Sequence, residues 1–204
     1  MTVSLALMGM SREDKLDYIL NVTSLCFGKF GYHQITLDLI AEKAEVSKGT
    51  LTYYFRNREG LIGSLIHHHS KKLLTSVREN VQKETDPKDR IVVGLESLWD
   101  AFYNDHRRLK AYCDLSAQAF FNERLKSEIV QIERAIRALF MEPIKAIALW
   151  KPDYDENVVI MKATAFAGLI DGMVRQILLD PESFESVKVK EAYKQVFLSL
   201  SDIV

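Results

Sequence analysis

Residues 45–61 read EVSKGTLTYYFRNREGL, and this stretch combines residue types that an ordinary core helix does not need. It carries a glycine, two threonines and two adjacent tyrosines among few apolar residues, and basic residues follow. Ser47 is expected to cap a helix that ends near Phe55, because a serine hydroxyl accepts a hydrogen bond from an otherwise unpaired amide of the first turn. The mixture indicates a short helix with one anchored side and one side free for another task.

Successive helical residues are turned by 100°, so the two sides of this helix can be assigned. The apolar side is expected to hold the helix in place and consists of Val46, Leu51 and Phe55. The opposite side is small, hydroxyl-bearing and aromatic and consists of Gly49, Thr50, Thr52 and Tyr53. Threonine offers a donor, an acceptor and a methyl group to base edges, and tyrosine can reach a phosphate. This side is therefore suited to a DNA major groove.

The preceding helix makes the layout more specific. Thr36 is predicted to be its N-cap, and Asp38 lies in its first turn, where the helix dipole favours a carboxylate. Only Glu45 and Val46 stand between its last apolar residue, Ala44, and the next cap. Two short helices joined so closely form a helix-turn-helix. The same geometry with a solvated polar face, and no contact with DNA, is the alternative reading of the spacing.

Composition permits this function but does not demand it. The 204 residues are 48% hydrophobic and 27% charged, with a net charge of −1, which suits a soluble globular protein. Residues 43–72 nevertheless hold six lysines and arginines against two glutamates, and such a local surplus is what phosphate contact requires. Cys26 and Cys113 are too few for a disulfide scaffold and are expected to be buried, reduced thiols.

The whole chain is predicted to be helical, because its apolar residues recur with a helical period nearly everywhere. The expected helices span 11–29, the two of the helix-turn-helix, 58 to about 79, 88–104, 107–120, 123–149, 156–180 and 184–202. Gly31, Pro87, Pro152 and Pro181 lie between expected helices, where caps and stops belong. The segment before Ser11 is expected to be a flexible lead-in, with neither a signal peptide nor a membrane span evident.

Residues 16–65 resemble the DNA-binding region of the TetR family of bacterial transcriptional regulators. The resemblance rests on Phe27, Gly31-Tyr32, Thr36, Ile40-Ala41, Ala44, Val46 to Leu51, Tyr54-Phe55 and Asn57 to Leu61. It implies an all-α fold with a three-helix DNA-binding domain over residues 1–57 and a larger helical domain for ligand binding and dimerisation over residues 58–204. The later part of the chain resembles the family only in length and helical pattern.

The resemblance also assigns contacts. It implies that Thr36 and Arg58 touch phosphates. It implies further that the residues at or in the major groove are Lys48, Gly49, Thr50, Tyr53 and Tyr54, and Thr52 shares the outward face.

Two residues depart from the family pattern. Thr52 replaces a common tyrosine, so an aromatic phosphate contact is missing or has passed to Tyr53. Glu45 replaces a common glycine, and if the position keeps a left-handed backbone its side chain costs about 1 kcal/mol, with its charge facing DNA.

Two features of residues 58–204 bear on assembly and ligand binding. Ala165, Gly168 and Gly172 repeat at spacings of three and four and form a smooth helical stripe. Internal core packing would explain it, and the resemblance favours a dimer interface made by the last two helices of each subunit. A set of aromatic residues comprises Trp99, Phe102, Tyr103, Tyr112 and Phe166. These side chains either belong to the core or line a pocket for a flat apolar compound or a cation.

His67-His68-His69 cannot all hold one ion, because three successive helical residues fan over about 200°. The sequence carries no phosphate-binding glycine loop, nucleophile elbow or HExxH motif, so we expect neither an enzyme nor a cofactor.

The leading hypothesis is a cytoplasmic, homodimeric repressor that a small-molecule inducer releases from a pseudo-palindromic operator. The inducer would act by tilting the fourth helix. The alternatives are an activator on the same scaffold and a helical ligand-binding module whose DNA binding has weakened.

Overall fold

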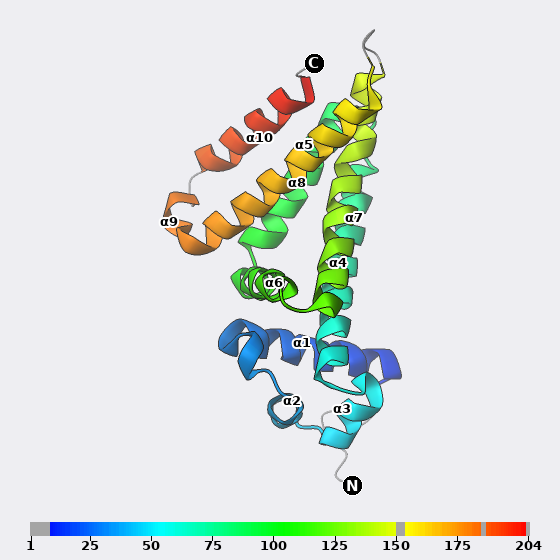
Figure 1. The fold of residues 1–204 in the computed structure, drawn as a ribbon, viewed down its shortest axis with the longest axis vertical. Helices are drawn as coiled ribbons and strands as arrows, with labels where there is room; N and C mark the ends of the chain where they lie inside the picture. Colours follow the sequence, from blue (N-terminus) through cyan, green and yellow to red (C-terminus); the bar gives the residue numbers. More distant parts are fainter. Residues whose placement is uncertain (1–8, 150–153, 185–186, 203–204) are drawn as a thin grey trace. The chain divides into compact units, whose positions relative to one another are not determined.

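A computed structural model describes residues 9–149, 154–184 and 187–202 of the chain, and every regular element in these ranges is helical (Figure 1). This confirms the predicted all-α class. The elements in chain order are α1 (Arg12–Phe30), the 3₁₀ turn η2 (Tyr32–Gln34), α2 (Leu37–Lys43), α3 (Lys48–Phe55), α4 (Arg58–Val81), α5 (Pro87–Tyr103), α6 (His106–Ala119), α7 (Glu123–Ala148), α8 (Glu156–Leu179), α9 (Pro181–Phe184) and α10 (Val187–Asp202).

The predicted helices agree with these bounds to within a few residues, except at the C-terminal end. There the chain forms a separate short helix, α9, which starts at Pro181 directly after α8. Asp180 closes α8 and also holds Ser183, whose hydroxyl donates to the Asp180 carboxylate over 2.6 Å. The expected stop at Pro152 and the lead-in up to Met8 lie outside the described residues.

Helices α1, α2 and α3 are each capped at their N-terminal end by a side chain. Ser11 opens α1 with a reciprocal capping box to Asp14. Thr36 Oγ1 accepts from the amide of Leu39 at the start of α2, and Ser47 Oγ accepts from the amide of Thr50 at the start of α3. Each cap contributes about 1 kcal/mol. The predicted caps at Thr36 and Ser47 are therefore confirmed.

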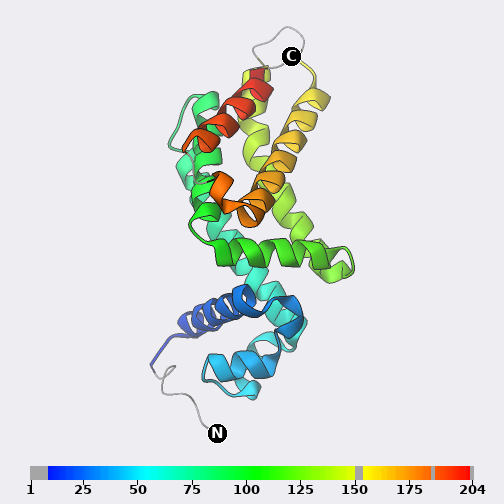
Figure 2. The same cartoon turned by 90° about the vertical axis from the view of Figure 1, so that its left-hand side faces the viewer.

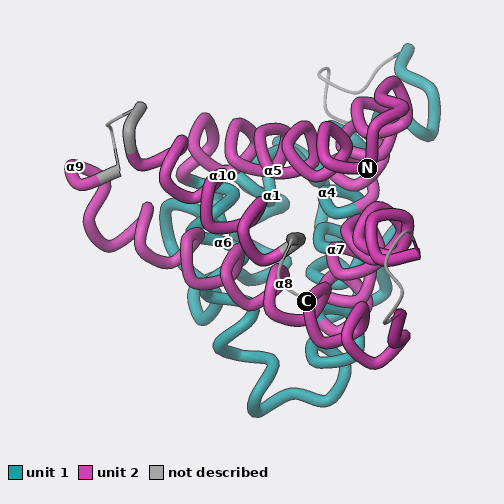
Figure 3. Tube along the Cα trace, turned by 90° about the horizontal axis from the view of Figure 1, so that it is seen from above, with its two compact units in different colours: residues 1–70, 107–129 teal, residues 71–106, 130–204 magenta. Residues whose placement is uncertain are grey.

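The described chain divides into two compact units (Figure 3). Unit 1 comprises residues 1–70 and 107–129, and unit 2 comprises residues 71–106 and 130–204. Helices α4 and α7 contribute residues to both units. The predicted functional boundary after residue 57 falls inside unit 1, which also takes in nearly all of α6.

The core of unit 1 holds the helix-turn-helix together. Helix α2 packs against both α1 and α3. The buried apolar side chains of these elements and the start of α4 are Ile19, Leu20, Phe27, Ile35, Ile40, Leu51, Phe55, Leu61 and Ile62. Their burial gives α3 a fixed orientation within the unit.

The two cysteines are free thiols on different elements of unit 1. Cys26 is buried on α1, as predicted, and burial raises the pKa of its thiol. Cys113 on α6 is half-buried, so the prediction of a second buried thiol is wrong for this residue.

In unit 2, α10 packs along α5 and also contacts α8 (Figure 2). Rings from three helices meet in its core, where the centroid of Phe166 lies 5.5 Å from that of Phe140 and 4.7 Å from that of Phe197. Helix α8 is long and apolar enough to cross a membrane by length and composition alone, but core helices of soluble proteins share these properties. Its inner side chains, such as Ala163 and Phe166, lie in the unit 2 core.

Candidate nucleic-acid interface

Helix α3 is anchored on its apolar side. Leu51 and Phe55 are buried, at 0% and 4% exposure. The amide of Val46 donates to the carbonyl of Ala41 over 2.9 Å, which ties the turn to the end of α2. The anchoring residues that the sequence predicted are therefore the ones that fix the helix.

The opposite side of α3 faces solvent. Tyr53 is 74% exposed. Lys48, Gly49 and Thr52 are also exposed, whereas Thr50 and Tyr54 are half-buried. The rings of Tyr53 and Tyr54 meet edge to face, with their centroids 5.3 Å apart. An aromatic side chain that is exposed to this extent is available to a partner.

Hydrogen bonds within α3 restrict what its hydroxyls can offer. Ser47 Oγ lies 2.9 Å from Thr50 Oγ1. Thr52 Oγ1 donates to the carbonyl of Lys48, one turn earlier, over 3.0 Å. With its hydrogen used in this way, Thr52 presents an acceptor and a methyl group to the outside. The Thr52 oxygen can accept a hydrogen bond from a base-edge donor, and its methyl group can contact a thymine methyl.

Glu45 has a left-handed backbone, with φ of 53°. The position therefore keeps the left-handed backbone that the sequence analysis considered. A glutamate in this conformation costs about 1 kcal/mol of stability relative to glycine. Glu45 is exposed on the turn between α2 and α3. Its carboxylate adds a negative charge close to α3, the second helix of the helix-turn-helix, which is called the reading helix below.

Cations near the turn are held by neighbouring carboxylates. Lys48 Nζ lies 2.9 Å from Asp38 Oδ2, and Lys43 Nζ lies 2.7 Å from Glu42 Oε1. The hydrogen bond to Glu42, followed by the charge of that carboxylate, raises the pKa of Lys43. Exposed pairs of this kind contribute little to stability, so phosphates can replace the carboxylates at little cost.

Arg58 has a task inside unit 1 that the sequence reasoning missed. Its Nε donates to the carbonyl of Ile35 over 2.6 Å, and Nη2 donates to the carbonyl of Tyr32. The guanidinium also lies over the Tyr32 ring, 4.2 Å from its centroid. With 24% of its side chain exposed, Arg58 is mainly engaged in fixing the turn that leads to Thr36. Nothing in the local sequence around Arg58 signals these distant carbonyl partners.

The aromatic set predicted for a ligand pocket is only partly brought together. Trp99 and Tyr103 stack on α5, with centroids 6.1 Å apart. Phe102 is buried, and Phe166 belongs to the ring cluster of the unit 2 core. Tyr112 lies on α6 and belongs to unit 1.

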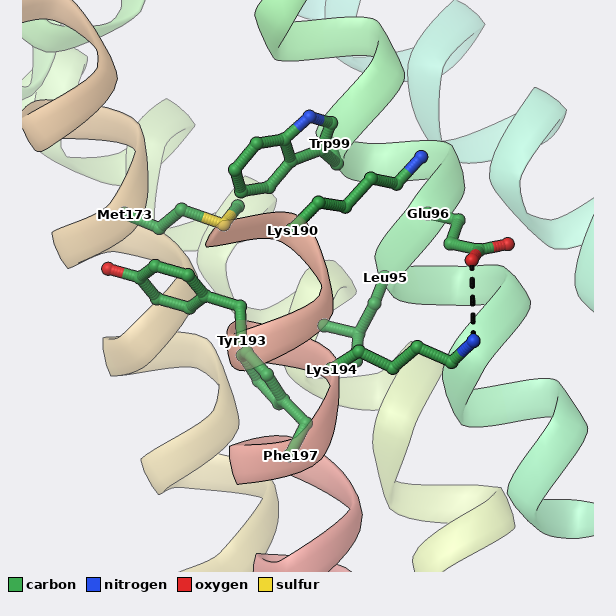
Figure 4. Close-up of a pocket in the computed structure, with 8 residues that line it drawn as sticks. All are labelled: Leu95, Glu96, Trp99, Met173, Lys190, Tyr193, Lys194 and Phe197. Atoms are coloured by element: carbon green, nitrogen blue, oxygen red, sulfur yellow. Dashed lines mark ion pairs between the residues drawn. The ribbon is translucent and has the colours of Figure 1, made fainter. Parts of the chain in front are cut away.

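A small, shallow hollow, open to solvent, lies in unit 2 (Figure 4). Of the predicted aromatic set, Trp99 lines it. Its other lining residues are Leu95, Glu96, Met173, Lys190, Tyr193, Lys194 and Phe197. Lys190 Nζ lies 3.0 Å from Asp100 Oδ1, and Lys194 Nζ lies 3.7 Å from Glu96 Oε1. Burial raises the pKa of Tyr193.

The small-residue stripe of α8 faces away from the core. Ala165 and Gly168 are exposed and Gly172 is half-buried. A Cβ added at Gly168 or Gly172 would meet no atom of another described element within 4 Å. Internal core packing, the alternative explanation of this stripe, is therefore wrong.

The three histidines lie on α4 without forming a metal cluster. His68 Nδ1 lies 3.5 Å from Asp17 Oδ1 on α1. Within the described parts of the chain, no three His, Cys, Asp or Glu side chains are grouped to hold a metal ion.

Comparison with known proteins agrees with this geometry. Residues 19–65 match the family described as bacterial regulatory proteins, tetR family. The chain is 24% identical over 188 residues to the HTH-type transcriptional regulator BetI of Proteus mirabilis (strain HI4320), covering 89% of this chain and 90% of BetI. It is 28% identical over 96 residues to the HTH-type transcriptional activator FasR of Mycolicibacterium smegmatis, covering 47% of this chain and 44% of FasR.

A solved structure of another transcriptional regulator shares the fold. The transcriptional regulator FadR from Bacillus subtilis, solved in complex with stearoyl-CoA, superposes with a TM-score of 0.78 at 19% identity, covering 90% of this chain and 97% of FadR. The matched segment contains η2, the complete helix-turn-helix and the first turns of α4. Residues 19–65 therefore form a DNA-binding domain of the tetR family of bacterial regulatory proteins, and the chain that carries it is a DNA-binding transcriptional regulator.

Proposed function

We propose that the protein is a homodimeric repressor that binds a pseudo-palindromic operator and leaves it when a small-molecule inducer binds. The observation that carries this proposal is the outward side of α3. Leu51 and Phe55 anchor the helix from behind, and Tyr53 is 74% exposed on the outward side. In a helix-turn-helix the second helix enters the major groove, and a two-fold dimer reads two half-sites about 34–36 Å apart or multiples of that distance.

The proposed contacts follow from exposure and from the remaining hydrogen-bonding capacity. The residues assigned to the groove are Lys48, Gly49, Thr50, Thr52, Tyr53 and Tyr54. Thr36, exposed at the positive end of α2, is assigned to a phosphate, since helix N-termini bind anions. Arg58 is assigned to positioning, because two carbonyls already accept from it.

The dimer interface is assigned to α8 and α10. The exposed stripe of Ala165 and Gly168 lets another helix approach closely. Large apolar side chains are exposed along the same two helices, at Met161, Leu179 and Val196. A second copy packed here would cover an apolar surface that a lone subunit leaves in water.

The inducer site is assigned to unit 2, around Trp99. The hollow beside Trp99 combines apolar walls with the ammonium groups of Lys190 and Lys194. Their exposed ion pairs contribute little, so an anionic ligand group can displace the carboxylates. Stearoyl-CoA, the ligand of the FadR structure, combines an apolar chain with anionic groups. The proposed class is therefore an apolar compound with an anionic group.

An inducer acts only through a difference in affinity between the DNA-bound and the released states. Helix α4 is one continuous element whose residues belong to both units. We assign transmission to it, through a change in the spacing of the two reading helices. The role is regulatory rather than catalytic, and its place of action is the bacterial cytoplasm, where the operator is.

Activation of transcription is the second candidate. The observation that favours it is the similarity to FasR, which is named as an activator. The same reading helix serves either role, and the position of the operator relative to the promoter decides between them. Mapping the bound site against the transcription start separates repression from activation.

The test is selection of DNA from a random duplex library by the full-length protein, followed by gel shift. We expect a salt-sensitive complex with a sequence made of two related half-sites. Long-chain acyl-CoA should raise the thermal stability of the protein and dissociate the protein–DNA complex. If the protein selects no sequence, the proposal is overturned, and the protein is then better described as a helical ligand-binding module.

A further inference from the structure

Tyr32, in the turn η2 that joins α1 to α2, is held at both of its main-chain polar groups by charged side chains from distant helices. Its amide donates to Asp114 Oδ2 of α6 over 2.6 Å. Its carbonyl accepts from Arg58, at the start of α4. A carboxylate at the amide and a guanidinium at the carbonyl match the polarity of these groups, and hydrogen bonds to charged partners are the stronger kind.

The same arginine reaches the far end of the turn. Arg58 Nε donates to the carbonyl of Ile35, the residue before Thr36. Thr36 caps α2, and α2 packs against the reading helix α3. The path from Asp114 to α3 therefore runs through Tyr32, Arg58 and the first residue of the helix-turn-helix. All of these residues lie in unit 1.

Helix α6 approaches this turn along one face. A Cβ at Gly28 would lie 2.8 Å from Cβ of Arg107, and a Cβ at Gly31 would lie 3.3 Å from Asp114 Oδ2. Gly31 also has φ of 74°, which favours glycine. One turn beyond Asp114, Gln118 Nε2 lies 3.5 Å from His33 Nε2. Glycines thus allow α6 close to the turn, where Asp114 makes the bond.

We propose that Asp114 is a positioning residue for DNA recognition, which sets the orientation of the helix-turn-helix through Tyr32 and Arg58. The inference rests on the proposed operator binding. Asp114 lies outside the segment that matches the family and in the part of the chain where the sequence reasoning expected ligand binding. The buried side chains Ile40, Leu51 and Phe55 hold the reading helix without it, so loss of Asp114 acts on orientation before it acts on folding.

The experiment compares full-length variants on a duplex selected by the wild-type protein. Asp114→Ala removes both the acceptor and the charge. Asp114→Asn removes the charge and keeps an oxygen that accepts from the Tyr32 amide. Glu123→Ala is the charge control, because Glu123 is an exposed residue of unit 1 paired only with Lys126 among the described contacts.

The direction of the change in DNA affinity distinguishes a positioning role of Asp114 from the effect of its charge alone. Removing a negative charge by itself raises affinity for DNA, so Glu123→Ala should bind as tightly as wild type or slightly tighter. Asp114→Ala should bind about tenfold or more weakly, the loss expected for one hydrogen bond to a charged group. Asp114→Asn should recover most of this loss.

Salt dependence separates positioning from partial unfolding. A misplaced reading head loses phosphate contacts, so the slope of log affinity against log salt should become shallower for Asp114→Ala. A smaller folded fraction would lower the apparent affinity and leave that slope unchanged. The proposal is overturned if the slope is unchanged, if Asp114→Ala binds as tightly as wild type, or if Asp114→Asn is as weak as Asp114→Ala. If the wild-type protein selects no duplex, operator binding itself has failed.

Discussion

At the scale of single residues, the turn of the helix-turn-helix shows what local sequence can and cannot predict. Caps at Thr36 and Ser47 and the burial of Leu51 and Phe55 follow from neighbours within one helical turn, and these predictions are confirmed. The bonds of Arg58 were not predictable, because their carbonyl partners lie 23 and 26 residues away. The DNA contacts themselves stay predictions.

Glu45 offers a test of strain and charge at one position. Glu45→Gly should raise the free energy of unfolding by about 1 kcal/mol, since glycine adopts the left-handed backbone without cost. It should also tighten DNA binding by about 0.5 kcal/mol at low salt, because a carboxylate near the phosphates is removed. Urea denaturation and fluorescence anisotropy measure the two effects.

Glu45→Gln is the matched control for that prediction. It removes the charge and keeps the side chain, so it should tighten DNA binding without gaining stability. Equal stability of Glu45→Gly and wild type would show that the turn carries no backbone strain.

At the scale of elements, helix positions were predictable and helix junctions were not. Periodicity and caps are local, so the bounds of the long helices follow closely from sequence. The junction between α3 and α4 depends on a close approach that no periodicity encodes. A Cβ at Gly60 would lie 2.0 Å from the carbonyl oxygen of Phe55. Gly60 is therefore required by the way α4 folds back under the end of the reading helix.

Gly60→Ala should destabilise the protein by about 1–3 kcal/mol, because backbone atoms at this junction have to move apart. Gly63→Ala, in the same helix, is the control. A Cβ at Gly63 has its nearest neighbours at 3.9 Å, so this change should be neutral or stabilising by up to about 1 kcal/mol. Thermal unfolding of both variants measures the difference. Equal effects would contradict the contact at Gly60.

At the scale of the whole molecule, the sequence predicted a smooth stripe on α8 but could not show which way it faces. The direction in which the stripe faces depends on how α8 packs against other helices, among them α7 and α10, and the period of the apolar residues does not encode that packing. In the structure the stripe is open: apart from the adjoining atoms of α8 itself, no atom of the described residues lies within 4 Å of a Cβ placed at Gly168 or Gly172. The grouping of α6 with the helix-turn-helix in unit 1 was equally hidden, since it joins segments far apart in sequence.

Gly168→Arg should break the proposed dimer, because a long charged side chain prevents the close approach of a second helix. Gly168→Ala should keep the dimer and stabilise α8 by up to about 1 kcal/mol, since alanine is the better helix former. Sedimentation velocity gives the oligomeric state. A Gly168→Arg protein that stays dimeric would place the interface elsewhere.

The central claim is that the outward side of α3 reads DNA sequence, and Tyr53 tests it most directly because its 74% exposure makes it dispensable for folding. The measurement is the affinity for the selected duplex divided by the affinity for a scrambled duplex, at one salt concentration. We predict that wild type prefers the selected duplex by about 10³-fold or more, and that Tyr53→Ala loses most of this preference with unchanged helicity. An equal preference in the two proteins would contradict the account.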